Sequence, residues 1–154
     1  MGKKAKNRRI KRAVVRLERR GHHVTVWEQH DETYNSIANV IMSVSQQGIL
    51  LQDKELVSFT KDAKLVEAKA VELAQRLKGL TIRVKELRGM HHGKTGIVPA
   101  DQEELAMNIM VGYSEVGNEI QSTVLPLSVE LSELLDEAHA ARMVAKASAE
   151  KEVA

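Results

Sequence analysis

The sequence predicts a mainly α-helical protein in which a basic N-terminal arm precedes a long antiparallel helical hairpin. Three features predict this fold: a heptad stripe of apolar residues within 56–87, a second stripe within 106–145, and a turn between them that contains glycine and proline. A 3.5-residue repeat keeps apolar side chains on one side of a helix, as packing between helices requires. We therefore expect residues 1–21 to form the arm with a short helix, and residues 22–154 to form a single helical domain.

The first stripe lies on an expected helix over 54–90, with Asp53 as its N-cap. Its ten positions are separated alternately by three and four residues, and all of them are apolar. They are Leu56, Phe59, Ala63, Val66, Ala70, Leu73, Leu77, Leu80, Val84 and Leu87. Because a single helix cannot bury such a stripe by itself, a second helix must lie beside it.

An earlier helix is expected over 32–47, with Asp31 as its N-cap and Gly48 at its C-terminal end. Apolar residues at helical spacing predict its buried face. They are Ile37, Val40, Ile41 and Val44. Residues 22–30 stay ambiguous, because Val24 and Val26 alternate with polar neighbours and allow either a short strand or an extended connection.

The second helix of the hairpin is expected over 101–145, after a turn at 89–99. Asp101 followed by Glu104 is typical of a capping box at the start of a helix. The positions of the stripe that follows, apolar except for Thr123, are Ala106, Ile109, Tyr113, Val116, Ile120, Thr123, Leu127, Leu131, Leu134, Ala138, Ala141 and Ala145. The stripe shifts at Leu127 beside Pro126, and proline removes a helix hydrogen bond, so we expect a kink there.

Residues 80–127 allow a second interpretation, an α+β fold with a small barrel in this segment. The spacing of three glycines and a valine resembles the KOW motif of SH3-like barrels, which occur in ribosomal and transcription-elongation proteins. These residues are Gly89, Gly93, Gly96 and Val98. The resemblance implies an RNA- or ribosome-binding factor whose glycine loop contacts RNA or protein. Gly112 and Gly117 favour this interpretation, because each glycine costs about 1 kcal/mol inside a helix.

Several classes of site are not expected in this chain, and neither enzymatic activity nor a cofactor is predicted. The chain has no Cys, which excludes a cysteine nucleophile and a cysteine zinc site. Gly93-Lys94-Thr95 resembles the end of a phosphate-binding loop, but that motif needs a glycine where Arg88 stands. The six histidines lack the spacing of a metal site, so we expect no bound metal and place the histidines at the surface or against a partner.

The N-terminal arm carries the clearest functional signal. Ten of the 23 Lys and Arg residues, but only one of the 21 Asp and Glu residues, lie within 1–20, so this segment carries +9 while the whole chain carries +2. Blocks of like charge at a terminus are typical of interaction tails, and nucleic acid is a common partner. The predicted phosphate-binding residues are Lys3, Lys4, Lys6, Arg8, Arg9, Lys11, Arg12, Arg16, Arg19 and Arg20.

This binding is expected to be independent of nucleotide sequence, because the arm has no aromatic residue that could stack on bases. The alternative that stays open is a protein-only helical adaptor, in which the arm contacts an acidic partner. The turn at 89–99 adds a smaller cationic surface at the tip of the hairpin. Its expected contact residues are Arg88, His91, His92 and Lys94.

A basic arm, a helical hairpin and an acidic body together resemble small phage packaging and virion-assembly proteins, including small terminase subunits and internal head proteins. The resemblance implies a non-enzymatic nucleic-acid-associated protein that assembles with further copies of itself into a ring or lattice. No apolar run approaches the roughly 18 residues that span a bilayer, so no membrane partner is expected. We expect a cytoplasmic location, in the host cytoplasm or the virion if the protein is viral.

Overall fold

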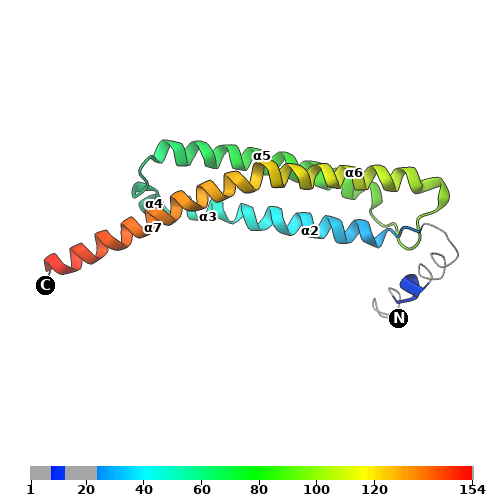
Figure 1. Cartoon of the computed structure of the whole chain (residues 1–154), viewed down its shortest axis with the longest axis horizontal. Coiled ribbons are helices and arrows are strands. Elements are labelled where there is room, and N and C mark those ends of the chain that lie inside the picture. Colours follow the sequence, from blue (N-terminus) through cyan, green and yellow to red (C-terminus); the bar gives the residue numbers. More distant parts are fainter. Residues whose placement is uncertain (1–7, 13–23, 154) are drawn as a thin grey trace. The chain divides into compact units, whose positions relative to one another are not determined.

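The computed structural model describes residues 8–12 and 24–153, and these residues are mainly helical (Figure 1). Residues 8–12 form a short helical segment. The later helices are α2 (Glu28–Ser45), α3 (Gln47–Leu50), α4 (Lys54–Ser58), α5 (Ala63–His91), α6 (Glu103–Glu119) and α7 (Leu125–Val153). A 3₁₀ turn at Ala100–Gln102 precedes α6, and a π-helical turn at Ile120–Val124 precedes α7. The prediction of a mainly α fold is confirmed.

The described part of the chain divides into two compact units. Unit 1 contains the described residues up to Ala38 together with Arg83–Val116. Unit 2 contains Asn39–Ile82 and the residues from Gly117 onward. Each unit has buried apolar residues of its own.

The alternative of an SH3-like barrel is not supported, because residues 80–127 are mostly helical and the described residues contain only one isolated β-bridge, between Val26 and Ile97. The glycines that favoured it have other roles. Gly93 and Gly96 adopt φ angles of 78° and 81°, which only glycine adopts readily, and they shape the loop after α5. Gly112 lies inside α6, where an added Cβ would stand 2.6 Å from Leu87 Cδ2, so glycine allows close packing of α6 on α5.

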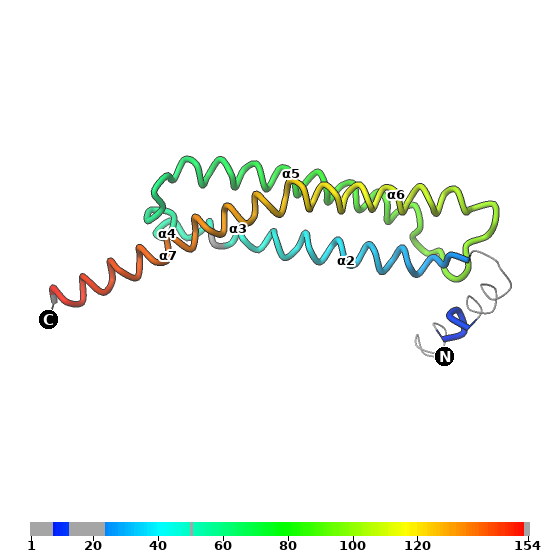
Figure 2. The backbone as a smooth tube through the Cα atoms, in the orientation of Figure 1, coloured from blue at the N-terminus to red at the C-terminus, as the bar shows by residue number. Residues whose placement is uncertain are grey.

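Unit 1 is built from the beginning of α2, the end of α5 and most of α6. The loop after α5 reverses the chain, so that α6 runs beside the end of α5 in the opposite direction (Figure 2). This loop is fixed to the start of α2 by three hydrogen bonds: Trp27 N–H donates to the Gly96 carbonyl at 2.9 Å, Val98 N–H donates to the Thr25 carbonyl at 2.9 Å, and Gly96 N–H donates to Glu28 Oε1 at 2.8 Å.

The predicted bounds of the first long helix were wrong at both ends. The helix begins at Glu28 rather than after Asp31, because buried Trp27 and the bridge at Val26 fix the chain just before it. Asp31 instead lies in the first turn, where a carboxylate interacts favourably with the helix dipole. Gly48 does not end the helix, since it lies inside α3.

The core of unit 2 is made by apolar residues of α4, α5, the π-helical turn and α7. It contains Leu56, Val66, Leu73, Leu77, Leu80, Val124, Leu127, Leu131, Leu135 and Ala138. The predicted continuous helix over 54–90 is interrupted between Ser58 and Ala63. Side chains explain the interruption: Thr60 Oγ1 donates to the Val57 carbonyl at 2.6 Å, and Asp62 caps the next helix by accepting from Leu65 N–H at 3.1 Å.

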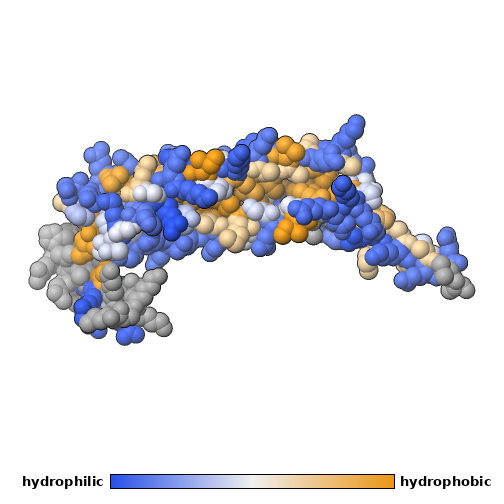
Figure 3. Space-filling view, turned by 180° about the vertical axis from the view of Figure 1, so that it is seen from behind, coloured by the Kyte–Doolittle hydropathy of each residue, from blue (hydrophilic) through white to orange (hydrophobic). Residues whose placement is uncertain are grey.

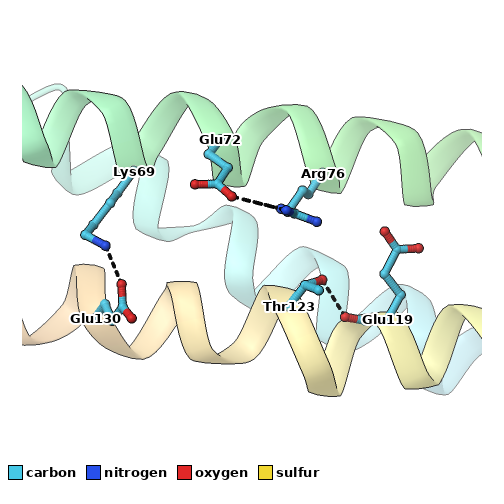
Figure 4. A network of polar contacts seen from close by, with 6 residues as sticks. All are labelled: Lys69, Glu72, Arg76, Glu119, Thr123 and Glu130. Carbon is cyan, nitrogen blue, oxygen red and sulfur yellow. Dashed lines mark hydrogen bonds and ion pairs between the residues drawn. The ribbon is translucent and has the colours of Figure 1, made fainter.

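Polar contacts in unit 2 lie at the edge of this core (Figure 4). Lys69 on α5 forms an ion pair with Glu130 on α7, and Glu72 pairs with Arg76 at 3.2 Å within α5. Thr123 Oγ1 donates to the Glu119 carbonyl at 2.7 Å. Exposed ion pairs contribute little to stability, so the apolar stripe is the main source of cohesion in this unit.

At Pro126 the helix adjusts by forming a π-helical turn in the residues just before the proline. Leu125 N–H donates to the Ile120 carbonyl, five residues back, and the wider turn gives room to a ring that would otherwise clash with the preceding turn. The extra residue shifts the later stripe, so that Leu135 is buried while the predicted Leu134 is only half-buried. Ala141 and Ala145, also predicted for the stripe, are exposed. None of the helices in the described residues is long and apolar enough to span a bilayer.

Candidate functional site

The described part of the basic arm is exposed. Arg8, Arg9, Lys11 and Arg12 occupy the short helical segment, and all four side chains face solvent. The other predicted phosphate-binding residues lie outside the described residues. They are Lys3, Lys4, Lys6, Arg16, Arg19 and Arg20.

The four residues predicted at the hairpin tip do not form one exposed group. Arg88 is exposed and its guanidinium carbon lies 4.8 Å from the centroid of the Tyr34 ring. The Lys94 ammonium lies 5.3 Å from the Trp27 ring, and His92 is exposed. His91 is buried, so the prediction of a surface position was wrong for this histidine.

Unit 1 instead encloses a row of four aromatic rings, which we call the ring row: Trp27, His30, His91 and Tyr113. Neighbouring ring centroids lie 5.2, 5.4 and 5.8 Å apart along this row. Trp27 lies just before α2, His30 in its first turn, His91 at the end of α5, and Tyr113 in α6. The ring row therefore connects all three helical segments of unit 1.

His30 is fixed by one hydrogen bond and has one free ring nitrogen. Its Nε2 lies 3.0 Å from the Ala106 carbonyl oxygen. A carbonyl can only accept, so Nε2 carries the hydrogen and donates. Its other ring nitrogen, Nδ1, is buried with no hydrogen-bond partner among the described residues.

His91 forms a buried pair with Tyr113. Its Nε2 lies 2.6 Å from the Tyr113 hydroxyl oxygen. Its Nδ1 lies 3.3 Å from Asp31 Oδ1 but without the geometry of a hydrogen bond. Burial lowers the pKa of His91 below its usual 6.5, and His30 and Arg88 lower it further, while Asp31 opposes them. At neutral pH the imidazole is therefore uncharged, and its contact with Asp31 is not an ion pair.

Tyr113 is a neutral partner in this arrangement. Burial raises the pKa of Tyr113 to about 12, and the charge of Asp31 acts in the same direction. The hydroxyl thus keeps its hydrogen and can donate it to His91 Nε2, while the carboxylate of Asp31 favours a hydrogen on Nδ1. Because His30 and His91 are only 2% and 1% exposed, a substrate cannot reach these imidazoles as the unit stands.

The burial of His30 and His91 was not predicted from the sequence, because the expected stripe of the first hairpin helix stopped at Leu87. His91 follows Val84 and Leu87 with the same steps of three and four, and Tyr113 lies on the stripe of the opposite helix. His30 follows Trp27 by three residues on the buried side of α2. Buried histidines on neighbouring stripes are the signal that could have predicted the ring row.

A second feature lies in unit 2, where an apolar groove of about 320 Å³ opens between α2 and α3 on one side and α5 on the other. Seen from behind, apolar residues gather along the middle of the face that Figure 3 shows. The lining residues are Val44, Ser45, Gly48, Leu51, Ala70, Leu73, Ala74, Leu77, Lys78 and Thr81. Among the described residues, no group of three His, Asp or Glu side chains is placed to hold a metal ion.

No family model matches this sequence, and neither a curated protein nor a solved structure matches it significantly. Function is therefore inferred from the residues and their geometry.

Proposed function

We propose that this protein is a non-catalytic, nucleic-acid-associated assembly protein whose basic arm binds phosphates. The observation that carries the proposal is the charge of +9 within residues 1–20 of a chain whose total is only +2. The remainder of the chain is acidic and repels a polyanion, so a nucleic acid is directed to the arm. Packaging or virion assembly is the setting that we propose for this activity.

The exposed side chains of Arg8, Arg9, Lys11 and Arg12 support phosphate contact in particular. Several cationic groups within five residues can reach successive phosphates of one strand. Each contact releases condensed counterions, so the affinity must fall with salt and must vary little with nucleotide sequence. The arm contains no aromatic side chain for base stacking, which agrees with binding to the backbone of the nucleic acid.

The proposal predicts that the affinity for nucleic acid falls steeply with salt and that the arm causes this dependence. Replacing Arg8, Arg9, Lys11 and Arg12 with Gln should weaken binding to a duplex DNA probe at least tenfold. The slope of log K against log salt should become shallower by about 0.9 for each phosphate that the arm no longer neutralises. Fluorescence anisotropy between about 50 and 200 mM salt measures both quantities.

A matched control removes the same number of positive charges from unit 2 and the end of α5. Replacing the exposed residues Lys54, Lys61, Lys64 and Lys85 with Gln should change binding little. An RNA duplex probe should bind through the same residues. If neither probe binds at low salt, the interpretation as a protein-only adaptor replaces this proposal. If the control variant loses as much affinity as the arm variant, the arm is not the element that binds nucleic acid.

Assembly is the second part of the proposal, and we propose that the groove of unit 2 receives the C-terminal part of α7 from a second copy. That part of α7 extends beyond α4 (Figures 1 and 2). Met143 and Val144 on it are 69% and 67% exposed. Burial of such apolar side chains is favourable, and the groove of the same unit is apolar and not covered by described residues. The C-terminal part of α7 of each copy can therefore occupy the groove of the other copy.

Assembly through α7 predicts a change of mass in solution. Light scattering coupled to gel filtration should find a dimer or larger species, and Met143→Lys with Val144→Lys should yield the monomer. Val129→Lys is the control, because Val129 is an exposed residue of α7 that lies away from its C-terminal part. A monomeric parent protein at about 100 μM would exclude this assembly at affinities in the micromolar range.

A further inference from the structure

We propose that unit 1 contains an acid-operated latch, in which protonation of His91 beside His30 releases the start of α2 from α5 and α6. The proposal rests on the ring row and is independent of the proposed function. Both imidazoles are buried, and their ring centroids lie 5.4 Å apart. They come from different helices, so a charge on them acts between α2 and α5.

The hydrogen bonds of the latch tie these two helices to α6. His30 Nε2 donates to the Ala106 carbonyl at 3.0 Å, and His91 Nε2 lies 2.6 Å from the Tyr113 hydroxyl. Both Nδ1 atoms are buried without a hydrogen-bond partner among the described residues. A proton added to His91 therefore puts a charge on a buried ring whose Nδ1 has no hydrogen-bond partner among the described residues, about 5 Å from the ring of His30.

The charged groups around His91 come from each neighbouring element. From α2, Asp31 stands 3.3 Å from Nδ1 and favours protonation, while His30 opposes it. From α5, Arg88 also opposes it, and from α6, Tyr113 is neutral up to a pKa of about 12. Asp31 is exposed and solvent screens its charge, so burial prevails and lowers the pKa of His91.

The direction of the pH effect follows from this lowered pKa. An unfolded chain binds a proton at His91 below about pH 6.5, whereas the closed unit binds it only at a lower pH, because the pKa of His91 is lowered there. The closed state, in which the start of α2 packs on α5 and α6, is therefore most stable above pH 6.5. It loses stability as the pH falls from 6.5 toward the lowered pKa of His91. For each pH unit within that range, the ratio of closed to open unit 1 falls by about tenfold for this one histidine.

Trp27 provides a built-in reporter of the latch. It is the only Trp of the chain, it is buried, and its ring centroid lies 5.2 Å from that of His30. Opening of unit 1 must bring it into water. The described residues of unit 2 contain no comparable group, since the histidine there, His139, is only half-buried.

The test titrates the full chain from about pH 8 to about pH 5 and follows Trp27 by emission wavelength and acrylamide quenching. We expect a reversible red shift and increased quenching below about pH 6.5, with most of the far-UV circular dichroism retained. His91→Gln, which cannot titrate, should abolish the transition or move it by more than one pH unit. His92→Gln is the matched control and should leave the transition in place, because His92 is adjacent but exposed.

A second measurement on the unaltered protein covers the case in which His91→Gln does not fold. The imidazole protons of all six histidines can be titrated by NMR, and His91 is assigned by its contact with Tyr113. We expect His91 to take up its proton below pH 6.5, together with the exposure of Trp27. A His91 that is charged at neutral pH, or a Trp27 that stays inaccessible down to pH 5, would overturn the proposal.

Discussion

Leu56→Ala is expected to lower the free energy of unfolding of unit 2 by about 2–5 kcal/mol. Leu56 is 0% exposed although it lies on α4, a helix of only five residues. A helix this short is not stable by itself in water, so α4 depends on its packing against α7. Truncating Leu56 removes its buried side chain and leaves a cavity where α4 meets the core.

The polar contacts at the start of α4 cannot replace this apolar anchor. Asp53 accepts a hydrogen bond from Leu56 N–H at 3.1 Å, and Arg142 of α7 donates to its other oxygen at 3.0 Å. Both contacts lower the pKa of Asp53, the one to Leu56 most. The carboxylate is solvated, however, and exposed ion pairs contribute little. α4 is thus held mainly by Leu56.

Chemical denaturation followed by far-UV circular dichroism measures the loss of stability. Leu65→Ala is the matched control, because Leu65 is the same residue type in unit 2 but is 42% exposed. Its substitution should cost well under half as much as that of Leu56. Equal losses for the two variants would mean that α4 is not anchored by the buried leucine.

The helical fold could be predicted because its stripes are long and regular. Leu73, Leu77, Leu80, Val84 and Leu87 are all buried as the heptad pattern predicts. Such a pattern depends only on helical geometry and on the removal of apolar surface from water, which the order of residues determines directly.

The interruptions of the helices could not be predicted in the same way. The break after Ser58 depends on side chains such as Thr60 that bond back to the main chain, and it leaves the apolar spacing unchanged. Pro126 predicted a kink, but whether a kink or a π turn forms depends on which register buries more of α7. Local spacing does not contain that information.

The ring row could not be predicted from the sequence for a different reason. Histidine is common at surfaces, and only the packing of three helical segments shows that His30 and His91 are close together. The phosphate-binding role of the basic arm remains a prediction from charge, and it is consistent with the exposure of Arg8, Arg9, Lys11 and Arg12.

Gly112→Leu is expected to destabilise unit 1 by about 1–3 kcal/mol, although leucine is the better helix former by nearly 1 kcal/mol. A Cβ at position 112 would stand 2.6 Å from Cδ2 and 3.1 Å from Cδ1 of Leu87. Leu87 is buried and cannot turn away freely, so α5 and α6 must separate. Denaturation monitored by Trp27 fluorescence measures the effect in unit 1.

Gly89→Leu is the matched control, because Gly89 is also a helical glycine of unit 1 but has no atom within 4 Å of an added Cβ. It should be neutral or stabilising by up to about 1 kcal/mol. Adding Leu87→Ala to Gly112→Leu gives the new side chain room, so the double variant should be more stable than the sum of the two single effects implies. Strict additivity, or equal effects at positions 89 and 112, would show that helix propensity rather than close packing selects glycine in α6.

The contact between Gly112 and Leu87 also brings His91, one turn further along α5, beside Tyr113. Gly112→Leu should therefore loosen the ring row together with the packing of α5 on α6.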